Sequence, residues 1–209
     1  LAASRSIHER PVKISAELDY DIFFAGTMWP NRVATLRHIV AAFPDARLKL
    51  VCPGNEYLPP LPDDIAALAI QRPVSHEAFI DFANASAITL TMFRDYASHG
   101  DVSQATAPGP RYYELALAGT AQVVEAPEAM EARYFEDVEG VALARNVNGV
   151  IDAIARLLSN PDARDEAARQ AQSSVLERHL YETRLKRIAA VTGGRFGRRA
   201  KPCAVPARR

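Results

Sequence analysis

The chain of 209 residues is 48% hydrophobic and 24% charged, which is typical of a globular protein of one domain or two small ones. Its 25 basic side chains balance 25 acidic ones, so no global field draws it towards nucleic acid or a membrane. No apolar run approaches the roughly 18 residues of a membrane span, and no signal-peptide pattern opens the chain. We therefore expect a cytoplasmic protein with no nucleic-acid partner and no membrane span. Cys52 and Cys203 form no CxxC pair, which argues against a disulfide scaffold and a zinc site.

Three segments of different character follow one another along the chain. Residues 1–19 carry little hydrophobic periodicity and are predicted to be irregular. Residues 20–192 are predicted to form one domain. Residues 193–209 are rich in Gly, Pro and Arg, which indicates a flexible basic tail rather than a nucleic-acid-binding arm. Because the first residue is Leu1 and not Met, we expect a fragment or a trimmed chain.

Short buried strands are predicted in the first part of the domain. They are dense in β-branched and aromatic residues and are bounded by Gly, Pro or Asp. The predicted strands cover residues 21–26, 47–54, 87–93, 121–126 and 140–144, with a weaker one at 66–71.

Helical segments lie between these strands. Residues 31–43 have apolar side chains at helical spacing, and Ser75 is a predicted N-cap that places Glu77 in the first turn, where the helix dipole favours an acid. The segment 108–119 begins with prolines and ends at Gly119, the expected order of start and stop residues. After residue 146 only helices are predicted, and Asn160 caps one that has Pro161 at its first position.

The alternation of strands and helices predicts the α/β fold class. We expect a Rossmann-like parallel sheet of five or six strands over residues 20–146, with helices on both faces. The helices after residue 146 should pack back on this sheet or reach towards a partner domain.

Ligands of such a sheet bind in the loops that leave the carboxyl ends of the strands. Three loops stand out, at residues 25–32, 52–55 and 92–111. The amino end of a helix with an adjacent Arg suits a phosphate, because free N–H groups and a guanidinium both donate to it. The candidate substrate-binding residues in these loops are Gly26, Thr27, Arg32, Pro53, Arg94, Gly109 and Arg111, together with Glu114 in the helix that follows.

Motifs of several other chemistries are absent from the sequence. GxGxxG and GxxxxGK[ST] are missing, so neither a dinucleotide fingerprint nor a P-loop is present. No HExxH or paired-His spacing suggests a metal, and no GxSxG elbow suggests a hydrolase. We therefore expect a reaction driven by binding and electrostatics, without a metal or a cofactor.

Several of these segments occur in an order that resembles a known family. “YDIFFAGTMWPNR”, “VSHEAFIDFANASAITLTMFRD”, “PGPRYYELALAGTAQVVEAPEAMEARYFEDVEGVALA” and “HLYETRLKRI”, within residues 20–190, resemble the nucleotide-sugar-binding half of GT-B glycosyltransferases. The likeness is greatest to the CgeB-like, or spore-maturation-protein-like, branch, in which an Arg-x-x-Glu helix recurs. It implies metal-independent transfer of a sugar from a nucleotide-sugar donor to an unknown acceptor. It also implies an N-terminal GT-B domain that this chain lacks.

The resemblance assigns roles to individual residues. In that family the Glu of the helix binds the ribose hydroxyls of the donor, and Glu114 takes this position. Basic groups hold the diphosphate; Arg111 and Arg32 are the catalytic candidates, and Arg94 is a further one. Related retaining enzymes carry another Glu eight residues earlier, where this chain has Thr106.

Other interpretations of the same residues stay open. Arg111 and Glu114 could form a surface ion pair worth a few tenths of a kcal/mol, and Arg32 could be a solvated helix residue. His76 and His99 are interpreted as ordinary polar residues rather than catalytic bases. The alternative functions are a non-catalytic nucleotide-binding or protein-interaction module derived from a GT-B half, and a GT-B nucleotide-sugar epimerase.

Overall fold

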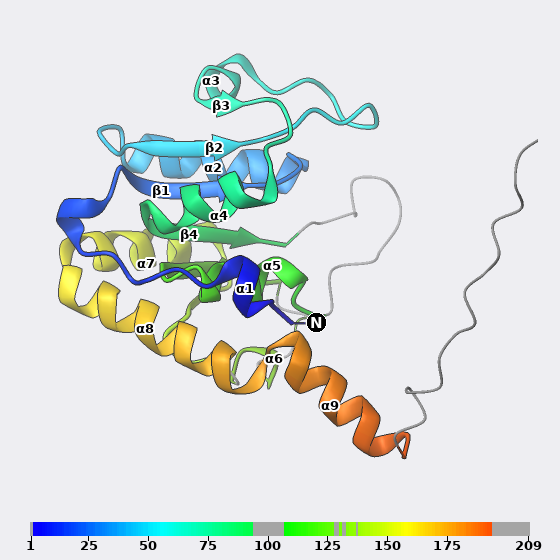
Figure 1. Ribbon diagram of the computed structural model, residues 1–209. Helices are drawn as coiled ribbons and strands as arrows, with labels where there is room; N and C mark the ends of the chain where they lie inside the picture. The colour runs from blue at the N-terminus through cyan, green and yellow to red at the C-terminus, as the bar shows by residue number, and fades with distance from the viewer. Residues whose placement is uncertain (1, 94–106, 128–129, 131–132, 137, 194–209) are drawn as a thin grey trace, which may run out of the picture.

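The computed structural model describes residues 2–93, 107–127, 130, 133–136 and 138–193, and within them it forms an α/β fold around a six-stranded sheet (Figure 1). Every strand pair is parallel, and the strand order is β3-β2-β1-β4-β5-β6. The strands are β1 (Tyr20–Ala25), β2 (Leu48–Val51), β3 (Ala69–Ile70), β4 (Ser86–Met92), β5 (Ala121–Glu125) and β6 (Ala142–Ala144). The predicted fold class is confirmed.

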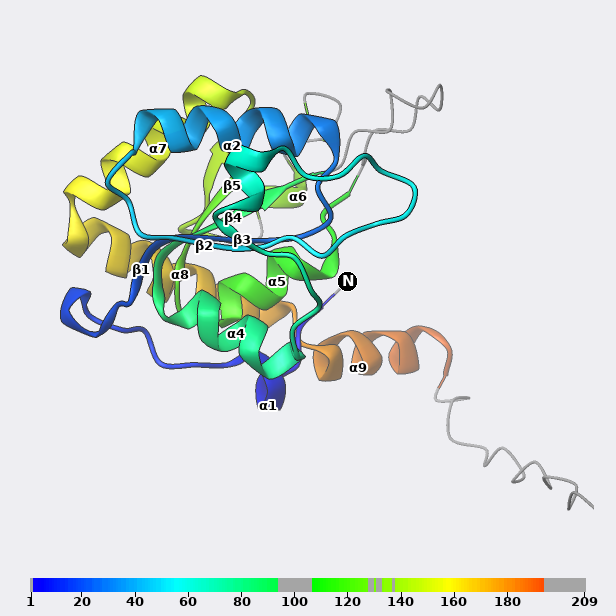
Figure 2. The same cartoon turned by 90° about the horizontal axis from the view of Figure 1, so that it is seen from above.

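Helices cover both faces of the sheet (Figure 2). The described helices are α1 (Arg5–His8), α2 (Pro30–Ala42), α3 (Asp63–Ala66), α4 (His76–Asn84), α5 (Pro110–Leu117), α6 (Arg133–Glu136), α7 (Val147–Ser159), α8 (Pro161–Arg178) and α9 (Tyr181–Val191). In Figure 2, α2 and α7 lie on one face, and α4, α5 and α8 lie on the other.

The alternation of side chains along β1 places apolar groups on both faces of the sheet. Ile22 and Phe24 point into the cluster that contains residues of α2 and α7, whereas Phe23 points into the cluster formed with α4 and α5. Because successive strand residues face opposite sides of a sheet, a strand that is covered on both faces needs apolar side chains on both. This requirement explains the continuous apolar runs in the sequence.

Local capping sets the helix boundaries where the sequence predicts it. Ser75 Oγ accepts a hydrogen bond from the backbone N–H of Ala78 at the start of α4, at 3.1 Å. Asn160 Oδ1 accepts one from Ala163 N at the start of α8, at 3.1 Å, with Pro161 at the first helical position. Both predicted N-caps are confirmed, because a cap depends only on residues within one turn.

The helices after residue 146 differ in their packing: two of them pack on the sheet and one extends away from it. Helix α7 packs on β4, β5, β6 and α2, and α8 packs on α5 and β5. Helix α9 instead extends away from the sheet in both views (Figures 1 and 2). No helix among the described residues combines the length and apolarity that a membrane crossing needs. Residues 194–209 of the predicted tail lie outside the described residues.

The N-terminal segment, predicted to be irregular, contains α1 and a 3-10 turn at Ser15–Glu17 and packs against the domain. Ala3 is fully buried, its backbone N–H donates to His179 O at 2.9 Å, and its carbonyl accepts from Tyr181 N at 3.0 Å. The segment therefore joins the loop between α8 and α9, a contact that hydrophobic periodicity does not report.

Gly119 allows this segment to cross the end of α5. Its φ is +72°, and an added Cβ would lie 2.7 Å from Arg10 O and 3.0 Å from Pro11 O. Asn84 Nδ2 donates to Pro11 O at 2.8 Å and to Ala118 O at 2.9 Å, while Gln172 Nε2 donates to Arg10 O at 2.7 Å. The glycine thus serves both the turn into β5 and the close approach of the two backbones.

Replacement of Gly119 by Ala is expected to lower the free energy of unfolding by at least about 1–2 kcal/mol, because the left-handed conformation disfavours a side chain. The Cβ would also press on the backbone of residues 10 and 11. Urea denaturation measures this change, with Gly54→Ala as the control, since a Cβ at Gly54 meets nothing within 4 Å. Equal stability of the two variants would contradict this account of the crossing.

Candidate functional site

Two cavities of about 330 Å³ each open at the carboxyl ends of the strands. The first, which we call the His76 cavity, is lined by Ala25, Gly26, Thr27, Val51, Pro53, Pro73, Val74, Ser75, His76, Phe79, Arg111 and Glu114. The second, which we call the Trp29 cavity, is lined by Thr27, Trp29, Arg32, Leu90, Thr91, Met92, Phe93, Ala107, Gly109, Pro110, Arg111 and Tyr112. Thr27 and Arg111 line both cavities, so the two adjoin.

The structure brings most of the predicted site residues to these cavities. Those that line the His76 cavity are Gly26, Thr27, Pro53, Arg111 and Glu114, and those that line the Trp29 cavity are Thr27, Arg32, Gly109 and Arg111. Arg94, Thr106 and His99 lie outside the described residues. The loops converge because parallel strands place their carboxyl ends at one edge of the sheet.

Arg111 lies between the two cavities, in the first turn of α5. Its Nη1 donates to the carbonyl of Ala25 at the end of β1, and its guanidinium carbon lies 4.6 Å from the centre of the Phe79 ring. Burial lowers the pKa of Arg111, and the charge of Glu114 opposes that shift. Among the described residues Arg111 and Glu114 form no ion pair with each other, so the surface-pair interpretation does not describe them.

Arg32 connects two strand ends. Its Nη1 donates to Thr27 O at 2.8 Å and its Nη2 to Met92 O at 2.6 Å, so it joins the loop after β1 to the end of β4. A Cβ at Gly26 would lie 3.1 Å from Arg32 Nη1, which is tighter than ordinary contact. The glycine at position 26 therefore leaves room for the guanidinium. Arg32 is partly buried and hydrogen-bonded to two strand ends, so it is not a solvated helix residue.

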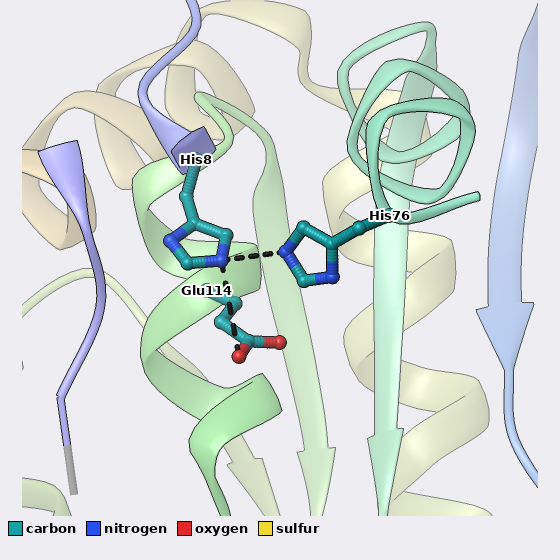
Figure 3. A group of neighbouring side chains, drawn as sticks. All are labelled: His8, His76 and Glu114. Atoms are coloured by element: carbon teal, nitrogen blue, oxygen red, sulfur yellow. Dashed lines mark hydrogen bonds and ion pairs between the residues drawn. The ribbon is translucent and has the colours of Figure 1, made fainter. Parts of the chain in front are cut away.

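Glu114 lies beside two histidines, His8 and His76 (Figure 3). His8 Nε2 lies 3.8 Å from Glu114 Oε1 and 2.7 Å from His76 Nε2. The three side chains come from α1, α5 and α4, which are far apart in the sequence. No spacing motif could reveal this cluster; the only local signal was Ser75, whose N-cap places His76 at the first position of α4.

Burial lowers the pKa of His8 below its ordinary value near 6.5. Glu114 raises this pKa, whereas His76 and Arg10 lower it further, and the burial contribution is the largest. The side chain is only 4% exposed, so a proton on it is poorly solvated. His8 is therefore neutral at pH 7 and has a ring nitrogen that can accept a hydrogen bond or bind a ligand.

The lowered pKa of His8 predicts a loss of stability in acid. The unfolded chain takes up a proton at this position as the pH falls below about 6.5, before the folded chain does, so the free energy of unfolding decreases there. His8→Gln should reduce the drop in stability between about pH 7.5 and 5.5, measured by urea denaturation. The exposed His38 gives the control His38→Gln, which should keep the pH dependence of the unchanged chain. An identical pH dependence in both variants would contradict the prediction.

Comparison with known proteins agrees with the arrangement of strands and loops. The family model described as “Glycosyl transferase-like” matches residues 25–190. No curated protein sequence matches the chain significantly.

Solved structures that resemble the chain include sugar-phosphate synthases, an alpha-glucosyltransferase and a putative UDP-N-acetylglucosamine 2-epimerase. Sucrose-phosphate synthase from Thermosynechococcus elongatus superposes with a TM-score of 0.66 at 15% identity, over 93% of this chain and 51% of that one. A TarM variant from S. aureus, in complex with fondaparinux, alpha-GlcNAc-glycerol and UDP, gives 0.61 at 14% identity, over 88% and 37%. Alpha,alpha-trehalose 6-phosphate synthase from Burkholderia multivorans gives 0.56 at 11%, over 90% and 46%.

At these identities the structural likeness establishes the fold alone. The chain spans about half the length of sucrose-phosphate synthase and less of TarM. The matched family residues, by contrast, cover most of the chain, from the end of β1 into α9. The chain therefore belongs to the glycosyl transferase-like family and has the fold of one half of a GT-B glycosyltransferase.

Proposed function

We propose that this chain is the domain of a CgeB-like glycosyltransferase that binds the nucleotide-sugar donor. The observation that carries the proposal is the position of Arg111 between two adjoining cavities, with Glu114 lining one of them. A nucleoside diphosphate has a neutral sugar at one end and an anionic diphosphate at the other. The cavities match this difference, because Glu114 lines one of them, whereas Arg32 and Arg111 line the other.

The His76 cavity is the proposed position of the nucleoside. Glu114 lies at its edge and can accept hydrogen bonds from two adjacent ribose hydroxyls. Val51, Val74 and Phe79 supply apolar surface against which a base can lie. A carboxylate in a partly buried position favours such an interaction, because hydrogen bonds to charged groups are stronger than neutral ones.

The Trp29 cavity is the proposed position of the diphosphate. Gly109 and Pro110 open α5 there, so the amino end of this helix and the Arg111 guanidinium can both face an anion. Arg32 adds positive charge, although its Nη1 and Nη2 both donate to backbone carbonyls. We assign Arg111 the direct contact and Arg32 the task of positioning the loop after β1.

This arrangement suits cleavage of the bond between the sugar and the diphosphate. As the acceptor hydroxyl attacks the anomeric carbon, that bond breaks and the leaving nucleoside diphosphate gains negative charge. Arg111 and the helix end would stabilise that charge in the transition state, which accelerates the step. We propose the donor as a substrate and assign no cofactor to the transfer.

Two substitutions test the proposed binding mode. Glu114→Gln should lower the affinity for UDP by about ten- to a hundred-fold, which corresponds to the roughly 1.5–3 kcal/mol of a hydrogen bond to a charged group. It should lower the affinity for inorganic pyrophosphate much less, because pyrophosphate has no ribose. Arg111→Ala should lower the affinity for both ligands. Isothermal titration calorimetry with UDP and with pyrophosphate measures these affinities.

Matched substitutions away from the cavities control this experiment. Arg156→Ala on α7 and Glu177→Gln on α8 change exposed side chains and should leave both affinities unchanged. If the unchanged chain bound none of the common nucleoside diphosphates at millimolar concentration, an interaction module would replace the present proposal. If Glu114→Gln lowered the melting temperature but not the UDP affinity, Glu114 would be structural.

We further propose that a second GT-B domain covers α9. Apolar side chains of this helix recur at helical spacing and are exposed: Tyr181 is 44%, Leu185 64% and Ile188 46% accessible. The chain spans only about half of the similar synthase, whose remaining length is enough for another domain. This apolar face of α9 is therefore a suitable contact for the domain that would bind the acceptor.

The double variant Leu185→Lys, Ile188→Lys is expected to change the unfolding free energy of the isolated chain by no more than about 0.5 kcal/mol, because both side chains are exposed. Urea denaturation measures the change, and Leu157→Lys, at a buried position of α7, is the destabilising control. A large destabilisation by the double variant would mean that this chain itself covers the face.

A further inference from the structure

The cluster of His8, His76 and Glu114 has the composition of a metal site (Figure 3). The ligand atoms of the three side chains all lie within 4.8 Å of one another. Two imidazoles and a carboxylate are a donor set that binds zinc in proteins, with a further position left for water. The side chains come from three separate elements, so the fold and not a local turn brings them together.

Contacts with the backbone of Ser4 orient the ring of His8. His8 Nδ1 accepts a hydrogen bond from the Ser4 backbone N–H at 2.8 Å and lies 3.0 Å from Ser4 O. In the other tautomer Nδ1 carries the proton and donates to the Ser4 carbonyl, and the lone pair of Nε2 is then available to a metal ion. Histidines that bind metals commonly donate their other ring N–H to a backbone carbonyl, which holds the ring in one orientation.

Two of the three distances between ligand atoms lie near the value that a zinc ion requires, and all three are within 4.8 Å. With Zn–N and Zn–O bonds of about 2.0–2.2 Å, tetrahedral ligand atoms lie about 3.3 Å apart. His8 Nε2 lies 2.7 Å from His76 Nε2 and 3.8 Å from Glu114 Oε1, on either side of that value. His76 is exposed at the start of α4, so its ring can withdraw by the required half ångström or so. His76 and Glu114 also line the His76 cavity, which gives an ion and its water a path.

We propose that His8, His76 and Glu114 form a binding site for a divalent transition metal of the zinc class. The site has three protein ligands and an open position towards the His76 cavity. Glu114 is also the residue that we propose for ribose, so, if that proposed function holds, the metal and the nucleoside diphosphate compete for it. The metal would then regulate donor binding and take no part in the transfer.

Zinc titration of the metal-free chain tests the site without any nucleotide. We expect one zinc ion per chain by isothermal titration calorimetry in a Cys203→Ser background, which removes the thiol of the tail. The other cysteine, Cys52, is fully buried and its pKa is raised to about 11, so it does not compete. His76→Ala and His8→Gln should each lower the zinc affinity by at least about 100-fold, since changing a residue that only orients a metal ligand already costs about 10- to 100-fold.

The control is His38→Ala, which removes an exposed histidine on α2 and should keep the full affinity for zinc. Because His76 is exposed, His76→Ala should leave the fold intact. This variant therefore tests the metal site even if His8→Gln fails to fold. The proposal is overturned if the unchanged chain binds no zinc, or if His76→Ala binds it as tightly. A UDP titration with and without zinc then tests the competition separately. If UDP does not bind at all, the proposed function is contradicted, but the proposed metal site is not.

Discussion

The side-chain amides of Asn84 and Gln172 hold the N-terminal segment against the end of α5, and the rest of the site depends on this contact. Gln172 donates to Leu117 O at 3.0 Å and to Arg10 O, and Asn84 donates to Ala118 O and Pro11 O. The last carbonyls of a helix have no partner within the helix, and burying them without one is costly. The two amides satisfy these carbonyls and at the same time join α4, α5 and α8 to the segment that carries His8.

This attachment determines what surrounds Glu114. Arg111 and Glu114 are three residues apart on α5, yet Arg111 points to the end of β1 and Glu114 towards the two histidines. The cation therefore borders both cavities while the carboxylate borders only one. Separating opposite charges in this way leaves each of them available to a ligand, whereas a direct ion pair would satisfy them internally. A ligand with an anionic and a hydroxyl-bearing part matches that separation.

Glu114 belongs to both the proposed nucleotide site and the proposed metal site. Glu114 can accept from hydroxyl groups or bind a cation, and the neutral state of His8 at pH 7 permits both. Which partner occupies Glu114 depends on concentration and affinity, because accepting from two ribose hydroxyls would use both oxygens of the carboxylate. His8 lies outside the sheet, on a segment that hydrogen bonds attach to the end of α5, and the N-terminal segment is therefore part of the site.

The sequence by itself determined the strands, the parallel sheet, the N-caps at Ser75 and Asn160, and the loops that line the cavities. These features follow from periodicity, capping and the rule for parallel sheets, which operate over a few residues or over whole elements. Only the tertiary structure decided that Arg32 braces two strand ends, that Gly119 admits the N-terminal segment, and that His8 lies 3.8 Å from Glu114. Each of these depends on groups that long-range packing brings together, and sequence spacing carries no information about such distances.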